Sequence, residues 1–314
     1  MASNNGKARL LLPAGVGDLY WTIVKFQAFC KRHGITDPYV STITGPEQFK
    51  GALLRSGEFL DMVPFIKIDE QAQTFINPLP PWLRSIYLSM WHGHRTSYHD
   101  FLGFDYLLVY NSAINSGKCL EKVDDLECNW YFPLNVSDEQ TLFKDQCVEK
   151  YGKYAVYLWS FCGGGYSEDF HVKQFSIDKL TESIKRFTQQ TKLTPVFVGG
   201  WYDMQWPNQY LNTMIPTIPD SVNLVGQTTL DQLFGVIKGA EIVIGCHCGP
   251  MVMSGVFHKK TVMMWAKSYP HFDPMSPWVV CPPDTRDTTY RPVFTNGLTV
   301  DSFVKKLTDL YEAD

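Results

Sequence analysis

The chain has 314 residues, which exceeds one ordinary domain and fits two domains of about 150 residues each. Hydrophobic residues make up 45% of it and charged residues 19%, which excludes a disordered protein and allows a sizeable core. The net charge of -4 argues against nucleic-acid binding through bulk positive charge, although a local basic groove stays open.

The N-terminal residues 1–7 are polar and lack the apolar run that a signal peptide needs. No stretch reaches about 18 uninterrupted apolar residues, so we expect no membrane span. The cysteines follow no disulfide-like spacing, and reduced thiols are the default without a secretion signal. We therefore expect a cytoplasmic protein.

The first half of the chain alternates between short apolar runs and helical patterns. A helix is expected from Asp18 to Gly34, and a capping-box pattern at Ser137 predicts another that runs to about Tyr151. The predicted strands of this half are 8–12, 39–43, 62–68 and 106–110. Such alternation is typical of a parallel sheet covered on both faces.

The second half repeats this alternation, most clearly over 222–265. Its predicted strands are 154–158, 195–198, 222–225, 242–244 and 261–265. Its predicted helices are 176–190, one capped by Thr228, 251–257 and 302–311. We assign the chain to the α/β class, with Rossmann-like domains over 1–148 and 149–300. Residues 301–314 form a terminal helix, for which packing back toward the N-terminal domain is one option.

The turn after the first predicted strand is the first candidate site. Gly15 and Gly17 let the backbone approach a ligand closely, and the helix N-terminus that follows favours an anion. Asp18 lies at this N-terminus, either as a chemical group or simply as the N-cap, where aspartate is a preferred residue. The turn lacks the third glycine of a dinucleotide fingerprint.

The loop 160–174 is the second candidate. Backbone N–H groups around Gly163 and Gly164 could wrap a diphosphate, and Lys173 could add a positive charge. A flexible connector with a solvated lysine is the alternative interpretation.

The junction 245–250 is the third candidate and resembles an anion-binding strand–loop–helix turn. Adjacent residues such as Cys246, His247 and Cys248 rarely complete a tetrahedral site, and no second ligand pair at zinc spacing follows, so we predict no metal. Because a helix N-terminus lowers a thiol pKa, Cys248 is also a candidate nucleophile, as is Cys162 elsewhere in the chain.

An aromatic and histidine-rich stretch over 91–98 is the fourth candidate. Trp91 and Tyr98 can stack on sugars or bases, and His92 and Arg95 can hold hydroxyls or phosphates. The alternative interpretation is a packed loop with a solvent-exposed edge.

Taken in order, these motifs resemble the heptosyltransferase-like glycosyltransferases of glycosyltransferase family 9. The family's Gly-Asp after the first strand resembles Gly17-Asp18, and its G-G resembles Gly199-Gly200. The other matching segments are its glycine loop with Lys-x-Trp (163–175), its L-x-G-x-T-x-L (224–230) and its D-S-G-P-M-H loop (247–252). The resemblance covers most of the second domain and about the first fifty residues.

The resemblance implies the GT-B fold, in which two Rossmann-like domains face each other. It implies an inverting transfer from a nucleotide-sugar donor to a hydroxyl acceptor, with Asp18 as general base and no metal or cofactor. The donor-binding residues it implies are Gly17, Gly163, Gly164, Lys173, Gly200, Thr228, His247, Cys248, Gly249 and Pro250. The acceptor would meet Trp91, His92, Arg95 and Tyr98.

This sequence departs from the family pattern at two positions of the last loop. His247 stands where the family has an acidic residue, and Val252 where it has a histidine. These changes leave open a non-catalytic nucleotide-sugar-binding protein. A further alternative is transfer to a modified nucleic-acid base, as some viral GT-B enzymes perform.

Overall fold

The computed structural model describes residues 6–12, 16–42, 59–68, 104–109, 120–123, 125–158, 175–200, 210–246, 248–265 and 286–313. Within these ranges no helix is long and apolar enough to cross a membrane. The chain divides into two compact units, Met1–Asn135 and Val136–Asp314.

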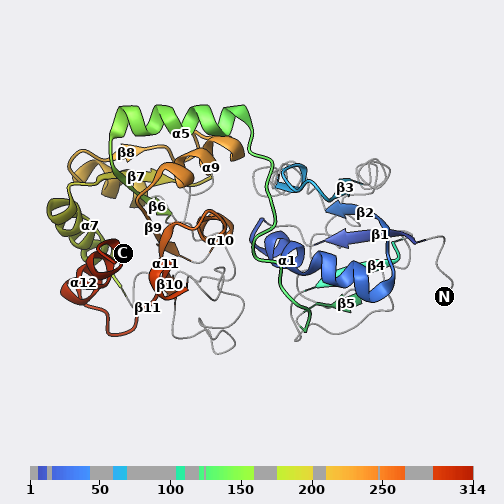
Figure 1. The fold of residues 1–314 in the computed structure, drawn as a ribbon. Coiled ribbons are helices and arrows are strands. Elements are labelled where there is room, and N and C mark those ends of the chain that lie inside the picture. The colour runs from blue at the N-terminus through green and yellow to red at the C-terminus, as the bar shows by residue number, and fades with distance from the viewer. Residues whose placement is uncertain are drawn as a thin grey trace. The chain divides into compact units, whose positions relative to one another are not determined.

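Among the described residues, a parallel sheet of five strands organises the first unit. The strands are β1 (Lys7–Leu12), β2 (Asp37–Thr42), β3 (Lys67–Ile68), β4 (Tyr106–Val109) and β5 (Leu120–Lys122). Their order across the sheet is β3-β2-β1-β4-β5 (Figure 1). Leu10, Leu11 and Leu12 are fully buried, as a central parallel strand covered on both faces requires.

Helix α1 (Val16–His33) follows β1 and carries the apolar face that its sequence predicts. The ring centroids of Phe29 and Tyr106 lie 5.3 Å apart, so α1 packs against β4. Gly34 ends the helix with a φ of 63°, a left-handed conformation that favours glycine. The predicted inward residues are all buried, namely Leu19, Ile23, Phe26 and Cys30.

The second unit contains a parallel sheet of six described strands. They are β6 (Tyr154–Leu158), β7 (Thr194–Val198), β8 (Val222–Asn223), β9 (Ile242–Cys246), β10 (Lys260–Trp265) and β11 (Tyr290–Phe294). Their order is β11-β10-β9-β6-β7-β8. Numbered from β6 along the chain, this is the doubly wound order 3-2-1-4-5-6.

Helices cover this second sheet. Figure 1 shows α5 (Asp138–Tyr151) alongside α9 (Leu230–Gly239), and α7 (Ile177–Thr191) near α12 (Val300–Tyr311). The shorter helices are α8 (Tyr210–Met214), the 3-10 helix η5 (Ile215–Thr217), α10 (Gly249–Val256) and α11 (Arg286–Thr289).

Two glycines let α9 approach its neighbours closely. A Cβ on Gly235 would lie 2.6 Å from the Gln140 carbonyl oxygen of α5, and one on Gly239 would lie 2.3 Å from the Tyr154 hydroxyl. That hydroxyl is buried and donates to the Val236 carbonyl at 2.7 Å, which fixes α9 on β6. The glycines, rather than an apolar stripe on α5, therefore set the distance between α5 and α9.

Replacing Gly235 by alanine is expected to lower the free energy of unfolding by about 1 kcal/mol. Alanine favours a helix over glycine by about 1 kcal/mol, but here its Cβ would collide with the backbone of α5, and such overpacking costs about 1–3 kcal/mol. Urea denaturation of the two proteins measures the difference. An alanine variant more stable than the wild type would show that the two helices separate at little cost.

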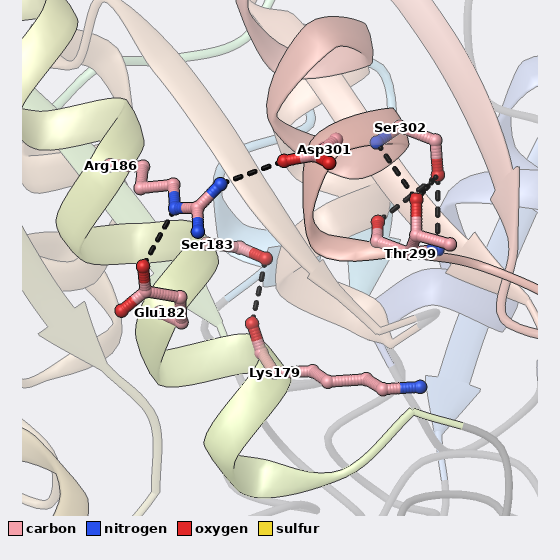
Figure 2. Close-up of polar contacts among 7 residues, drawn as sticks. All are labelled: Lys179, Glu182, Ser183, Arg186, Thr299, Asp301 and Ser302. Atoms are coloured by element: carbon pink, nitrogen blue, oxygen red, sulfur yellow. Dashed lines mark hydrogen bonds and ion pairs between the residues drawn. The ribbon is translucent and has the colours of Figure 1, made fainter.

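The terminal helix α12 packs on α7 within the second unit. Arg186 of α7 bonds to Glu182 of its own helix and to Asp301 of α12, at 2.6 and 2.7 Å (Figure 2). The Phe187 and Tyr311 rings meet edge to face. The structure thus places the terminal helix on its own unit, whereas one option from the sequence had it packing toward the N-terminal domain.

Several boundaries differ from the sequence expectations. The units divide at 135/136 rather than at 148/149, because α5 packs on α9 and so belongs to the second unit. Only Lys67–Ile68 of the predicted strand 62–68 is strand, since the chain makes a short helical turn at Phe59–Asp61 and further turns before it. Strands β5 and β11 were not predicted.

Candidate functional site

Strand order identifies one place in each sheet where a ligand site is expected. In the first unit β1 lies between β2 and β4, and in the second β6 lies between β7 and β9. The direction of chain winding reverses at these points, which leaves a crevice beyond the carboxyl ends of the adjacent strands. The segments after Leu12, Leu158 and Cys246 therefore border the expected sites.

In the first unit the segment after β1 leads into α1. This helix begins at Val16, so the backbone of Asp18 lies inside its first turn and Asp18 is not the N-cap residue. The N–H groups of this turn have no partner within the helix and face the end at which an anion is favoured. Gly17 is half-buried there. The side chain of Asp18 lies outside what the structure describes.

In the second unit β9 and β6 approach each other unusually closely at their carboxyl ends. Gly245 is paired with Leu158, and a Cβ on Gly245 would lie 2.1 Å from the Leu158 carbonyl oxygen. Gly245 and Cys246 belong to β9 and Gly249 and Pro250 belong to α10, so the predicted loop 245–250 is largely strand and helix in the described residues. The glycine brings the end of β9 close to the end of β6.

Helix α10 begins at Gly249. Cys248 precedes it in an extended conformation and makes no side-chain cap bond. Pro250 lies in the first turn and has no N–H, so the partly exposed backbone donor of this turn belongs to Gly249, while Met251 is fully buried. The N-terminus of α10 thus offers an N–H group at the carboxyl edge of the sheet, beside the switch point.

The segments after β7 and β8 are bonded to each other at the same edge. The Gly226 N–H donates to the Gly199 carbonyl at 3.0 Å, and the Leu224 N–H donates to the Phe197 carbonyl at 2.8 Å. These bonds place Gly200 close to the loop that carries Thr228. Because β7 is paired with β6, this part of the edge continues toward the switch point.

Thr228 does not cap α9, in contrast to the prediction. Thr229 is the N-cap, because its side chain accepts from the Gln232 N–H while the Gln232 side chain accepts from the Thr229 N–H. The Thr228 hydroxyl oxygen is buried and finds no hydrogen-bond partner among the described residues. A buried polar atom without a partner is costly, so this hydroxyl is well suited to meet a ligand.

The thiol alternative has little support from the described cysteines. The side chain of Cys248 is only 7% exposed. Burial raises the pKa of the Cys30 and Cys147 thiols to about 11, so neither supplies a thiolate at neutral pH. Cys162 lies outside the described residues.

The remaining predictions for the site divide into two groups. Val252, at the position of the family histidine, is 1% exposed and packs in the core, so no polar group replaces that side chain. The other positions lie outside the described residues and remain predictions. They are Gly163, Gly164, Lys173 and His247 for the donor, and Trp91, His92, Arg95 and Tyr98 for the acceptor.

Two features beside this edge were not predicted from the sequence. Thr229-Leu230-Asp231-Gln232 fits the capping-box pattern, which was a readable signal for the start of α9. Gly245 inside a strand was a readable signal for close backbone approach. In the described part of the chain no three His, Cys, Asp or Glu side chains gather where they could hold a metal ion.

Two doubly wound parallel units, each with a helix N-terminus after a strand at its switch point, define a class of two-domain α/β folds. The chain is similar in fold to Escherichia coli ADP-heptose lipopolysaccharide heptosyltransferase II, with a TM-score of 0.59, 15% identity, and coverage of 97% of this chain and 98% of that one. It is similar to a Veillonella parvula family 9 glycosyl transferase, with a TM-score of 0.60, 10% identity, and coverage of 99% and 98%.

A third similar structure is the E. coli heptosyltransferase WaaC with ADP-2-deoxy-2-fluoro heptose, with a TM-score of 0.56, 10% identity, and coverage of 96% and 99%. No protein-family model and no curated protein sequence matches the chain. The chain therefore has the GT-B fold of the family 9 glycosyltransferases, as the resemblance in its sequence implied.

Proposed function

We propose that this protein is a glycosyltransferase that moves a sugar from a nucleoside-diphosphate sugar to a hydroxyl acceptor. One observation carries the proposal. The described residues of the second unit that the sequence predicts to bind the donor lie at the carboxyl edge of its sheet, around the β6/β9 switch point. They do so in a chain whose fold matches heptosyltransferases over nearly its whole length.

The second unit binds the donor in this proposal. The N–H group of Gly249 at the start of α10 holds the diphosphate, with the positive end of the helix dipole behind it. The free hydroxyl of Thr228 donates to the donor from the neighbouring loop. Lys173 and His247 add positive charge, and Gly200 lets the backbone approach closely.

Asp18 acts as the general base in the first unit. It takes the proton from the acceptor hydroxyl as that oxygen attacks the anomeric carbon, and the bond from this carbon to the diphosphate oxygen breaks. Attack opposite the leaving group inverts the anomeric centre. The groups at α10 and Lys173 stabilise the leaving diphosphate, so the reaction needs neither a metal ion nor a cofactor.

The acceptor is held by Trp91, His92, Arg95 and Tyr98, through stacking on rings and bonds to hydroxyl groups. A nucleic-acid acceptor gains no support from the comparisons, since none of the three names refers to a nucleic acid. The buried Val252 favours one rival function, a nucleotide-sugar binder without turnover, because the polar side chain of the family is missing there.

A thermal-shift screen tests donor binding. UDP-, ADP- and GDP-sugars at about 100 times their Kd are expected to add about 2.7 kcal/mol of stability for the correct base. The matching nucleosides without phosphate are the control, because they cannot use the N-terminus of α10. If no nucleoside-diphosphate sugar raises the melting temperature, the proposed donor class is wrong. Binding without transfer or hydrolysis would favour the non-catalytic rival.

A further inference from the structure

The N-termini of α5 and α9 are joined by a compact set of side-chain hydrogen bonds. Both carboxylate oxygens of Asp231 are used, because Oδ2 accepts from the Ser137 hydroxyl at 2.9 Å and Oδ1 accepts from the Gln140 amide at 3.3 Å. In the opposite direction, Glu139 of α5 accepts from the Gln232 amide at 3.1 Å and from the Thr229 hydroxyl at 3.4 Å. The start of α9 is thus held by the start of α5.

These bonds lie partly out of water. The Gln140 side chain is fully buried and Asp231 is half-buried, so their bond exchanges with water less easily than a surface contact. A glutamine is a costly choice at a buried position, and the Gln140 Oε1 has no partner among the described residues. What Gln140 supplies at this position is the amide that holds Asp231.

Asp231 lies just beyond the loop that carries Thr228. The opposite end of this loop is fixed to β7 by the bonds from Leu224 to Phe197 and from Gly226 to Gly199. The segment that carries Thr228 therefore lies between two anchors, and Asp231 forms the half-buried part of the second one, beside the bonds of Glu139. If the Asp231 anchor is lost, the start of α9 can shift and the Thr228 hydroxyl loses its fixed position.

We propose that Asp231 is a positioning residue that, through Ser137 and Gln140, holds the Thr228 loop in the geometry required to bind the donor. This inference rests on the proposed function, because Thr228 is assigned there to the donor. Asp231 itself does not touch the ligand. Its effect is on the order of the loop, so it should appear in nucleotide affinity and in loop protection rather than in the chemical step.

The chain offers a closely matched control in Asp301. Asp231 and Asp301 both follow the first residue of a helix whose threonine N-cap forms a capping box, and both contact another helix of the same unit. Asp301 contacts Arg186 of α7 (Figure 2), and no predicted donor-binding position lies near it in sequence. Loss of either aspartate removes one acidic side chain from the first turn of a helix.

The test compares Asp231→Ala, Asp231→Asn and Asp301→Ala. Backbone hydrogen exchange over 225–229, measured without ligand, is expected to speed up about tenfold in Asp231→Ala and to stay unchanged in Asp301→Ala. Calorimetry with ADP, UDP and GDP should show binding weakened by about tenfold in Asp231→Ala only. Asp231→Asn keeps one acceptor oxygen, so its exchange rate and nucleotide affinity should lie between those of the wild type and Asp231→Ala. This variant still tests the proposal if the alanine variant does not fold.

The two proposals fail in different ways. If the wild type binds none of ADP, UDP and GDP, the donor assignment is wrong, and with it the functional part of this inference. If the wild type binds a nucleotide but exchange and affinity change equally in Asp231→Ala and Asp301→Ala, Asp231 acts only on general stability and the positioning role is overturned while the proposed function stands. An unchanged kcat with a raised donor KM agrees with positioning, whereas a loss confined to kcat contradicts it.

Discussion

Asp18→Asn is expected to lower the rate of sugar transfer about 1,000-fold while donor affinity stays unchanged. The amide is nearly the same size as the carboxylate, but it cannot take the proton from the acceptor hydroxyl. The donor is bound by the second unit in the proposed mechanism, so its affinity does not depend on this side chain. The measurement is kcat with the donor that the thermal-shift screen identifies, together with the Kd of its nucleoside diphosphate.

Asp125→Asn is the matched control for this variant. Asp125 accepts from Arg32 in the last turn of α1 at 2.9 and 3.1 Å, whereas Asp18 lies in the first turn of the same helix. Both substitutions remove one carboxylate beside α1, and only one of them is at the switch point. Asp18→Asn with near-normal kcat in a folded protein would exclude the base assignment. Equal losses in both variants would indicate damage to α1 rather than to the chemistry.

The sequence predicted the buried strands of the second unit well. Residues 154–158 were predicted as a strand and form β6 with the same bounds, since every side chain of this run is at most 1% exposed and a continuous apolar run is the signal of such a strand. Strand β3 has two described residues and β8 also has two, and neither has a fully buried run. Short strands of this kind leave almost no periodic signal to read.

The boundary between the two units was harder to predict than the strands, because α5 has little apolar character on any face. Among its residues only Gln140 and Cys147 are buried. It is held on α9 through the close approach at Gly235 and through polar bonds such as that from Gln140 to Asp231. Neither kind of contact leaves a periodic pattern of apolar residues in the sequence. The sequence therefore predicts the helix but does not indicate the unit to which it belongs.

The sequence predicted the candidate sites as separate turns and did not indicate which of them share the carboxyl edge of a sheet. Sequence patterns place glycines and a helix N-terminus after particular strands, but strand order comes from pairing between segments far apart in the chain. The structure supplies that order and shows that β1 ends beside the switch point of the first sheet, and β6 and β9 beside that of the second. The confusion between Thr228 and Thr229 has a local cause, because adjacent threonines are equally good caps until the partner Gln232 is considered.

Gly245→Ala is expected to lower the free energy of unfolding of the second unit by about 3 kcal/mol. The added Cβ would lie 2.1 Å from the carbonyl oxygen of Leu158 and 2.9 Å from its carbonyl carbon, and backbone atoms cannot turn aside as a flexible side chain can. Strands β9 and β6 would have to separate at their carboxyl ends, where the loop before α10 begins. Nucleotide affinity should therefore fall together with stability.

Gly34→Ala separates this clash from the general cost of losing a glycine. Gly34 has a φ of 63° and nothing within 4 Å of the added Cβ, so alanine there meets only the backbone cost of a left-handed residue, about 1 kcal/mol. Urea denaturation measures both variants, with hydrogen exchange in β1 reporting on the first unit, which holds Gly34, and exchange in β6 reporting on the second. If Gly245→Ala is no less stable than Gly34→Ala and binds nucleotide normally, the contact between β9 and β6 is not what fixes the loop. A larger loss in Gly245→Ala, with weakened binding, would tie the geometry of the donor site to the one position in β9 where only glycine fits against Leu158.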